Sequence, residues 1–102
     1  MTQLSQKIID IIASIPKGKV LSYGAVSALA GNPRAARQVS WLLKTQTDKH
    51  NLPWFRVINS RGLISIKDPD GYLTQKNMLI AEGIILDDCD KVNLNIYMWN
   101  GK

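Results

Sequence analysis

Isoleucines recur at helical spacing near the start of the chain. Ile8, Ile11, Ile12 and Ile15 are related by steps of three or four positions and share one face of an α-helix, and Ile9 stands beside that face. The pattern predicts an amphipathic helix over residues 4–15. The Pro-Lys-Gly sequence at residues 16–18 is expected to end it.

A short second helix containing Ala25, Val26 and Leu29 is predicted after Ser22. Ser22 is a suitable N-cap, because its hydroxyl can accept a hydrogen bond from a backbone N–H of the first turn. Val26 and Leu29 provide apolar positions, and Gly31 suits the left-handed conformation in which many helices end.

The third helix has the clearest start signal in the chain. Asn32 is a favoured N-cap, and Pro33 suits the first helical position. At about 100° per residue, apolar side chains gather on one face: Ala35, Ala36, Val39, Leu42 and Leu43. The opposite face carries Arg34, Arg37, Trp41 and Lys44. A short helix, a tight turn and a helix with a basic face are typical of a helix-turn-helix. Two packed helices with solvated arginines are the alternative.

The second half of the chain alternates short apolar runs with turn residues. Residues 45–52 are polar and are expected to form an exposed connection. Residues 55–59 and 63–66 flank Ser60-Arg61-Gly62, which predicts a small hairpin or wing. Residues 67–71 read as a loop, followed by a last helix that ends at Glu82-Gly83. The tail, residues 84–102, has strand-like stretches without a definite pattern. The expected fold is mainly α with a small β-hairpin, of the winged helix-turn-helix type.

Length and composition narrow the class of protein. A chain of 102 residues predicts one domain over residues 1–102. No apolar run approaches the roughly 20 residues that cross a membrane, and polar residues interrupt any signal-peptide core near the N-terminus. A single cysteine agrees with a reducing cytoplasm, and one cysteine with one histidine argues against structural zinc. We therefore expect a cytoplasmic monomer without metal, cofactor or membrane partner.

The net charge of +5 matters mainly through its placement. More than half of the basic residues lie between Lys7 and Lys49, whereas Asp87, Asp88 and Asp90 cluster near the end. The N-terminal half is therefore the candidate half for binding a polyanion.

Three segments closely resemble the DNA-binding domain of O6-alkylguanine-DNA alkyltransferases. They are Ile-Pro-Lys-Gly-Lys-Val-Leu-Ser-Tyr-Gly at 15–24, Gly-Asn-Pro-Arg-Ala-Ala-Arg at 31–37 and Pro-Trp-Phe-Arg-Val at 53–57. Those enzymes carry Pro-Cys-His-Arg-Val at the third segment, and the cysteine takes the alkyl group. Here Trp54 stands in place of that cysteine and Phe55 in place of the histidine. The substitution matches the alkyltransferase-like proteins, a family that binds alkylated guanine in DNA without repairing it. The resemblance covers residues 8–83.

The chemistry of alkyl transfer is missing from these positions. Transfer needs a thiolate, and indole and phenyl rings can neither attack a saturated carbon nor relay a proton. Cys89 does not follow a proline in such a motif and is read as an incidental tail cysteine. Glu82 matches the glutamate of the enzymes if one residue is inserted between Asn59 and Glu82; a structural role and a plain exposed acid both remain open. The sequence predicts no enzyme.

The resemblance also implies roles for individual residues. Arg37 matches the arginine finger that enters the duplex from the minor groove and fills the space of the flipped base. Tyr23 matches the tyrosine that crowds the 3′ phosphate and helps to rotate the nucleotide. Tyr23, Trp54 and Lys67 would together line the lesion pocket, and Lys67 is the candidate for sensing the O6 side of the base.

Arg34, Lys44 and Arg61 are the further candidates for contact with DNA. The predicted function is recognition of O6-alkylguanine in double-stranded DNA by minor-groove binding and nucleotide flipping. The resemblance adds nucleotide excision repair proteins as partners. The alternatives are a sequence-specific helix-turn-helix regulator and an alkyltransferase with a non-standard nucleophile.

Overall fold

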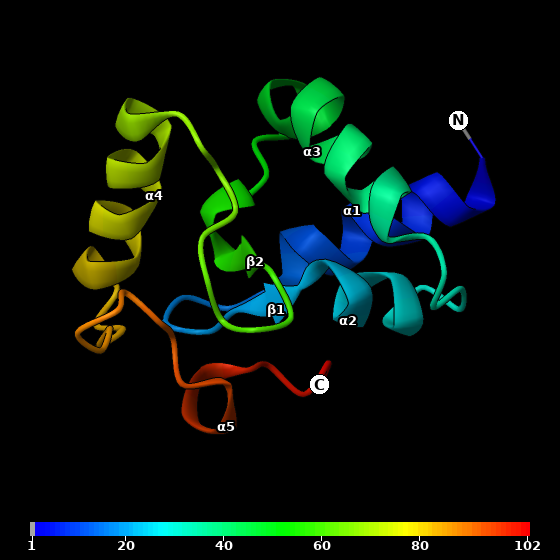
Figure 1. The fold of residues 1–102 in the computed structure, drawn as a ribbon. Coiled ribbons are helices and arrows are strands. Elements are labelled where there is room, and N and C mark those ends of the chain that lie inside the picture. Colours follow the sequence, from blue (N-terminus) through cyan, green and yellow to red (C-terminus); the bar gives the residue numbers. More distant parts are fainter. Residues whose placement is uncertain (1) are drawn as a thin grey trace.

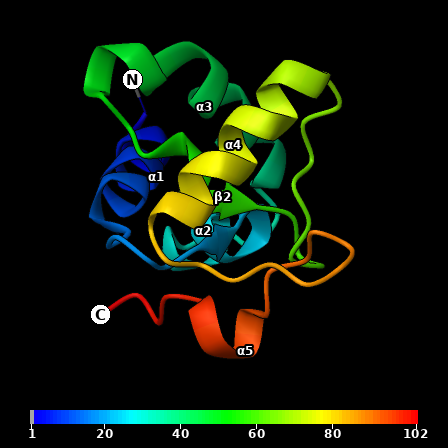
Figure 2. The same ribbon diagram turned by 90° about the vertical axis from the view of Figure 1, so that its left-hand side faces the viewer.

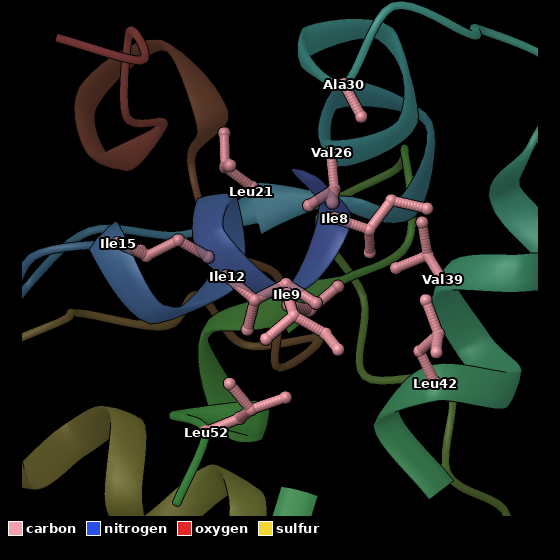
Figure 3. Close-up of a cluster of buried hydrophobic side chains, with 11 residues drawn as sticks. Ile8, Ile9, Ile12, Ile15, Leu21, Val26, Ala30, Val39, Leu42 and Leu52 are labelled. Atoms are coloured by element: carbon pink, nitrogen blue, oxygen red, sulfur yellow. The ribbon is translucent and has the colours of Figure 1, made fainter. Parts of the chain in front are cut away.

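Three helices pack around one buried apolar cluster (Figures 1 and 3). The structure, a computed structural model, describes residues 2–102. Helix α1 (Gln3–Ser14) is capped by the Thr2 hydroxyl, which accepts a hydrogen bond from the Ser5 N–H at 3.0 Å. Ile8 and Ile12 on its inner face are fully buried and belong to the same cluster as Val39 of the third helix, which Ile8 faces. The isoleucine pattern therefore placed this helix to within one residue at each end.

Helix α2 (Tyr23–Leu29) begins as predicted. The Ser22 hydroxyl accepts a hydrogen bond from the Ala25 N–H at 3.0 Å, and Gly31 after the helix has a φ of +94°. Helix α3 (Ala36–His50) packs against both α1 and α2. The two helices and their turn form the predicted helix-turn-helix.

The predicted start of α3 at Asn32 and Pro33 is wrong. The Asn32 side chain accepts from the Arg34 N–H at 3.1 Å, and its carbonyl accepts from the Ala35 N–H at 3.1 Å. Residues 32–35 therefore form a turn. An asparagine side chain can close a turn on its own backbone as readily as it caps a helix.

The expected connection over residues 45–52 is also wrong, because α3 continues to His50. The Thr45 hydroxyl donates to the carbonyl of Trp41 at 3.0 Å, so a polar residue is accommodated within the helix. Asn51 ends the helix in the left-handed conformation, with a φ of 51°. The polar residues at 45–50 indicate only that much of this end of the helix is exposed to solvent.

The sheet has two short parallel strands from distant parts of the chain. Strand β1 (Leu21–Ser22) pairs with β2 (Val57–Ile58), Leu21 opposite Val57. The predicted hairpin is therefore wrong: β2 takes its partner from the region before α2, and residues 63–67 form no strand. The Asn59 side chain accepts from the backbone N–H groups of Arg61 at 2.9 Å and Leu63 at 3.0 Å, which fixes a turn instead of a ladder.

Helix α4 (Pro69–Ala81) packs on the segment that leads into β2 (Figure 2). Its N-cap is Asp68, whose carboxylate accepts from the Gly71 N–H at 2.9 Å, so the helix starts inside the predicted loop. It ends at Glu82 and Gly83 as predicted, and Gly83 has a φ of +89°.

The tail pairs with Val20, the residue directly before β1, through an isolated parallel bridge to Met98. It contains a single-turn helix, α5 (Leu94–Tyr97), which lies on the opposite side of the molecule from α3 (Figure 2). The Val20 N–H donates to the Tyr97 carbonyl and the Trp99 N–H donates to the Val20 carbonyl, both at 2.9 Å. Among residues 2–102, no helix combines the length and apolar character that spanning a membrane requires.

Candidate nucleic-acid interface

A cavity of about 350 Å³ lies between α2, α3 and residues 54–57. This volume falls near the lower end of the roughly 300–1,000 Å³ that is common for small-ligand pockets. Both Tyr23 and Trp54, which the sequence predicted to share a pocket, line it. Lys44, predicted to contact DNA, is also part of the wall, and Asp48 stands one helical turn further along α3.

The strand pairing explains why Tyr23 and Trp54 line the same cavity. Tyr23 is the first residue of α2 and directly follows β1. Trp54 opens a short 3-10 helix, η1 (Trp54–Arg56), which directly precedes β2. Because β1 and β2 pair in parallel, the two aromatic residues are brought to the same cavity.

Trp54 lines a second cavity as well as the first. The second has a volume of about 440 Å³, and Thr47, Asp48 and Trp54 line both. The Phe55 ring stands almost perpendicular to the indole, with 6.1 Å between the centroids. Phe55 packs against a second cluster of buried apolar side chains, which contains Ile58 and Leu79. The position of the enzymes' histidine is therefore occupied here by a residue that supports the fold.

Arg56 and Glu82 form a half-buried ion pair behind the 3-10 helix. The Arg56 Nε donates to Glu82 Oε1 at 3.0 Å, its Nη1 donates to the Ile15 carbonyl at 2.8 Å, and its Nη2 contacts Glu82 Oε2. Glu82 Oε1 also accepts from the Gly18 N–H at 3.0 Å. Only 10% of the Glu82 side chain is exposed, so the structural role is confirmed and the plain exposed acid is excluded.

The charge of Glu82 is held in place by this network. Burial raises the pKa of Glu82, but hydrogen bonds from Arg56 and Gly18 and the charges of Arg56 and Lys17 outweigh burial, so the pKa lies below its usual 4.5. The carboxylate therefore joins the end of α4 to η1 and to the loop after α1.

The remaining predicted DNA contacts are surface residues. Arg34 lies in the turn before α3, Arg37 is the second residue of that helix, and Arg61 lies in the turn after β2; all three are exposed. Within residues 2–102, neither ion pair of the structure engages them. Their side chains are therefore available to a polyanion.

The structure does not bring Lys67 into the cavity wall. Its neighbour Ile66 lines the cavity, whereas Lys67 itself is exposed and precedes the Asp68 cap of α4. Alternation along an extended segment turns adjacent side chains to opposite sides.

Sequence reasoning missed several residues that shape the site. Gln75 is buried and donates to the carbonyls of Phe55 at 3.0 Å and Val57 at 3.1 Å, which fixes the segment that carries Trp54. A polar residue within an amphipathic helix gives no signal of such a role. Asp48 could have been found only by continuing α3 past residue 45.

The acidic residues Asp87, Asp88 and Asp90 line neither of the two cavities beside Trp54. Asp90 pairs with Lys76 at 3.0 Å and accepts from the Tyr72 hydroxyl at 2.8 Å. Cys89 beside it is exposed and lines neither cavity next to Trp54. In the described part of the chain, no group of three potential metal-binding side chains occurs.

Comparison with known proteins agrees with this arrangement. The sequence profile of the family "6-O-methylguanine DNA methyltransferase, DNA binding domain" matches residues 3–84. The chain is 44% identical over 95 residues to a DNA base-flipping protein of Escherichia coli, covering 93% of this chain and 73% of that protein. It is also 44% identical over 99 residues to a DNA base-flipping protein of Vibrio parahaemolyticus, covering 97% and 98%.

A solved structure extends the similarity to the whole fold. The crystal structure of Schizosaccharomyces pombe Atl1 in complex with damaged DNA containing O6-carboxymethylguanine superimposes with a TM-score of 0.83. The two chains are 39% identical, and the match covers 98% of this chain and 97% of that one. The chain therefore belongs to the alkyltransferase-like proteins, within the family defined by the DNA-binding domain of the 6-O-methylguanine-DNA methyltransferases.

Proposed function

We propose that this protein recognises O6-alkylguanine in double-stranded DNA and holds the flipped base reversibly in the cavity between Tyr23 and Trp54. The observation that carries the proposal is Trp54 in the cavity wall, at the position where the related enzymes carry their nucleophile. The similarity to two DNA base-flipping proteins and to Atl1, whose crystal structure contains damaged DNA, supports the proposal.

The energetics of flipping favour a damaged base. Taking a base out of the duplex costs a few kcal/mol, and the cost is lower for an alkylated guanine because it pairs badly. In the cavity, the indole of Trp54 offers an apolar face to a purine or to its alkyl group, and stacking of this kind contributes about 1–3 kcal/mol. Lesion preference then follows from the lower cost of flipping together with this contact.

Arg37 and Tyr23 are the residues proposed to keep the base outside the duplex. The planar guanidinium of Arg37 can stack in the space that the base leaves and bond the orphaned partner. The Tyr23 hydroxyl can bond the 3′ phosphate while its ring blocks the return path. Arg34, Lys44 and Arg61 would contact the backbone, and the long side chain of the exposed Lys67 would have to turn toward the cavity to approach the O6 side.

The side chains around the cavity would bind the alkylated base without transferring its alkyl group. Neither Trp54 nor Phe55 can supply a nucleophile or a base, and Cys89 lies in neither cavity beside Trp54. The bound lesion would leave unchanged and would be passed to nucleotide excision repair proteins. We further propose that the protein acts as a cytoplasmic monomer.

One binding comparison tests the function. Duplexes of identical sequence that carry guanine or O6-methylguanine at one position are titrated at fixed salt, because the electrostatic part of DNA binding depends strongly on salt. Preference for the lesion in several sequence contexts supports the proposal. Equal affinity for both duplexes would refute it, and strong preference for one undamaged sequence would favour a transcriptional regulator.

A further inference from the structure

A hydrogen bond joins the two sides of the cavity at its edge. The hydroxyl oxygens of Tyr23 and Ser65 are 3.0 Å apart. Tyr23 lines the cavity from α2, and Ile66, next to Ser65, lines it from the segment before α4. The bond therefore links residues that are remote in sequence at the place where a flipped nucleotide would enter.

Both partners of this bond are held by their own backbone. Tyr23 is the first residue of α2, directly after the Ser22 N-cap. The segment of Ser65 is anchored at one end by the Asn59 turn and by buried Ile64, and at the other end by the Asp68 cap of α4. The Ser65 hydroxyl consequently has a defined position relative to the phenol.

The hydrogen bond between the two hydroxyls can have the Ser65 hydroxyl as donor and the Tyr23 oxygen as acceptor. Each hydroxyl donates one hydrogen bond and accepts up to two. When the Ser65 Oγ–H donates to the Tyr23 oxygen, the phenolic hydrogen stays free for a phosphate oxygen. Hydrogen bonds in such a chain polarise and strengthen one another. Fixing the ring before DNA binds also lowers the ordering cost of binding.

We propose that Ser65 is a positioning residue for lesion capture, whose hydroxyl orients Tyr23 and leaves its phenolic hydrogen for the phosphate of the flipped nucleotide. This inference rests on the proposed function. Ser65 acts through Tyr23 and needs no contact with the base.

A double-mutant cycle tests the inference. Ser65→Ala and Ser65→Thr are made in the wild type and in the Tyr23→Phe variant, and dissociation constants are measured on duplexes with O6-methylguanine or guanine. Ser65→Ala is expected to weaken lesion binding by roughly 3- to 10-fold, the effect of one lost hydrogen bond. Ser65→Thr keeps a hydroxyl and is expected to restore most of the affinity. In Tyr23→Phe, which has no phenolic hydroxyl, Ser65→Ala is expected to have no further effect.

Ser14→Ala is the matched control, because Ser14 is also exposed and its hydroxyl bonds the Asp10 carbonyl at the end of α1. Equal losses from Ser65→Ala with and without the phenolic hydroxyl would overturn the inference, as would equal losses on both duplexes. If the wild type prefers the lesion and Ser65→Ala binds as the wild type does, this inference alone fails. If the wild type shows no preference, the proposed function fails.

Discussion

Replacing Glu82 by glutamine tests whether the carboxylate behind the cavity supports the fold. The substitution keeps the size of the side chain and removes its charge. It also places an amide NH₂ at the position of Oε2, which accepts hydrogen bonds from the Nε and Nη2 of Arg56, so that donors face donors. Arg56 would remain half-buried without its counter-charge.

The geometry sets the expected magnitude. Breaking a buried ion pair by changing one partner costs about 3–5 kcal/mol. The Arg56 and Glu82 side chains are 17% and 10% exposed, so solvent screens part of the interaction. The Gly18 N–H can still bond the amide oxygen of the variant. We expect Glu82→Gln to lower the free energy of unfolding by about 2–3 kcal/mol at pH 7.

The pH dependence gives the sign of the effect. The pKa of Glu82 is lowered in the folded state, so the unfolded chain takes up the proton first as the pH falls. The contribution of the carboxylate is fully present well above pH 4.5 and disappears as the pH falls through the lower folded-state pKa. The difference between wild type and Glu82→Gln should therefore shrink in acid.

Urea unfolding of both proteins from pH 7 to pH 3 measures this difference. Asp90→Asn is the control, because its pair with Lys76 is more exposed, and its effect at pH 7 should be smaller. Equal stabilities at pH 7, or a difference that stays constant in acid, would show that the pair does not act as described.

Three further predictions concern DNA binding and methyl transfer. Arg37→Ala should weaken binding to lesion DNA at least ten-fold (~1.4 kcal/mol), whereas Arg34→Ala should weaken lesion and normal duplexes alike; similar losses in anisotropy titrations would reduce Arg37 to a phosphate contact. Trp54→Ala should lose about 1–3 kcal/mol, or roughly 5- to 150-fold, on the lesion duplex and little on the normal one; unchanged lesion affinity would remove the indole from the pocket. Trp54→Cys should not accept a methyl group, because Phe55 cannot activate a thiol, and stable label on that variant after incubation with methyl-labelled DNA would contradict this reasoning.

The first two helices were predictable because local signals decide them. The isoleucine spacing of α1 and the Ser22 cap of α2 need no information from distant residues. The presence of Tyr23 and Trp54 in one cavity was predictable for another reason. Both residues lie in motifs of the alkyltransferase family, and the resemblance to that family implies that these motifs lie close together in space.

Two of the errors share a physical origin, because in each of them two local structures satisfy the same polar groups. The Asn32 amide serves a turn as well as a cap, and the Asn59 amide holds a turn where a hairpin was expected. The pairing of β1 with β2 involves two residues on each strand, too few to leave a periodic pattern. Gln75 and Ser65 act through contacts with distant segments that their own neighbours do not reveal.

The short parallel register has a consequence for when the protein becomes able to bind. Leu21 opposite Val57 and Ser22 opposite Ile58 determine how far Tyr23 stands from Trp54. A slip of one residue would displace the indole by about 3.3 Å and reverse the side to which neighbouring side chains point. Such long-range pairing forms only after a large chain loop has closed. A partly folded chain whose helices have formed but whose strands are unpaired would therefore lack the cavity that binds the base. Lesion DNA would bind and stabilise only the protein in which β1 and β2 are paired.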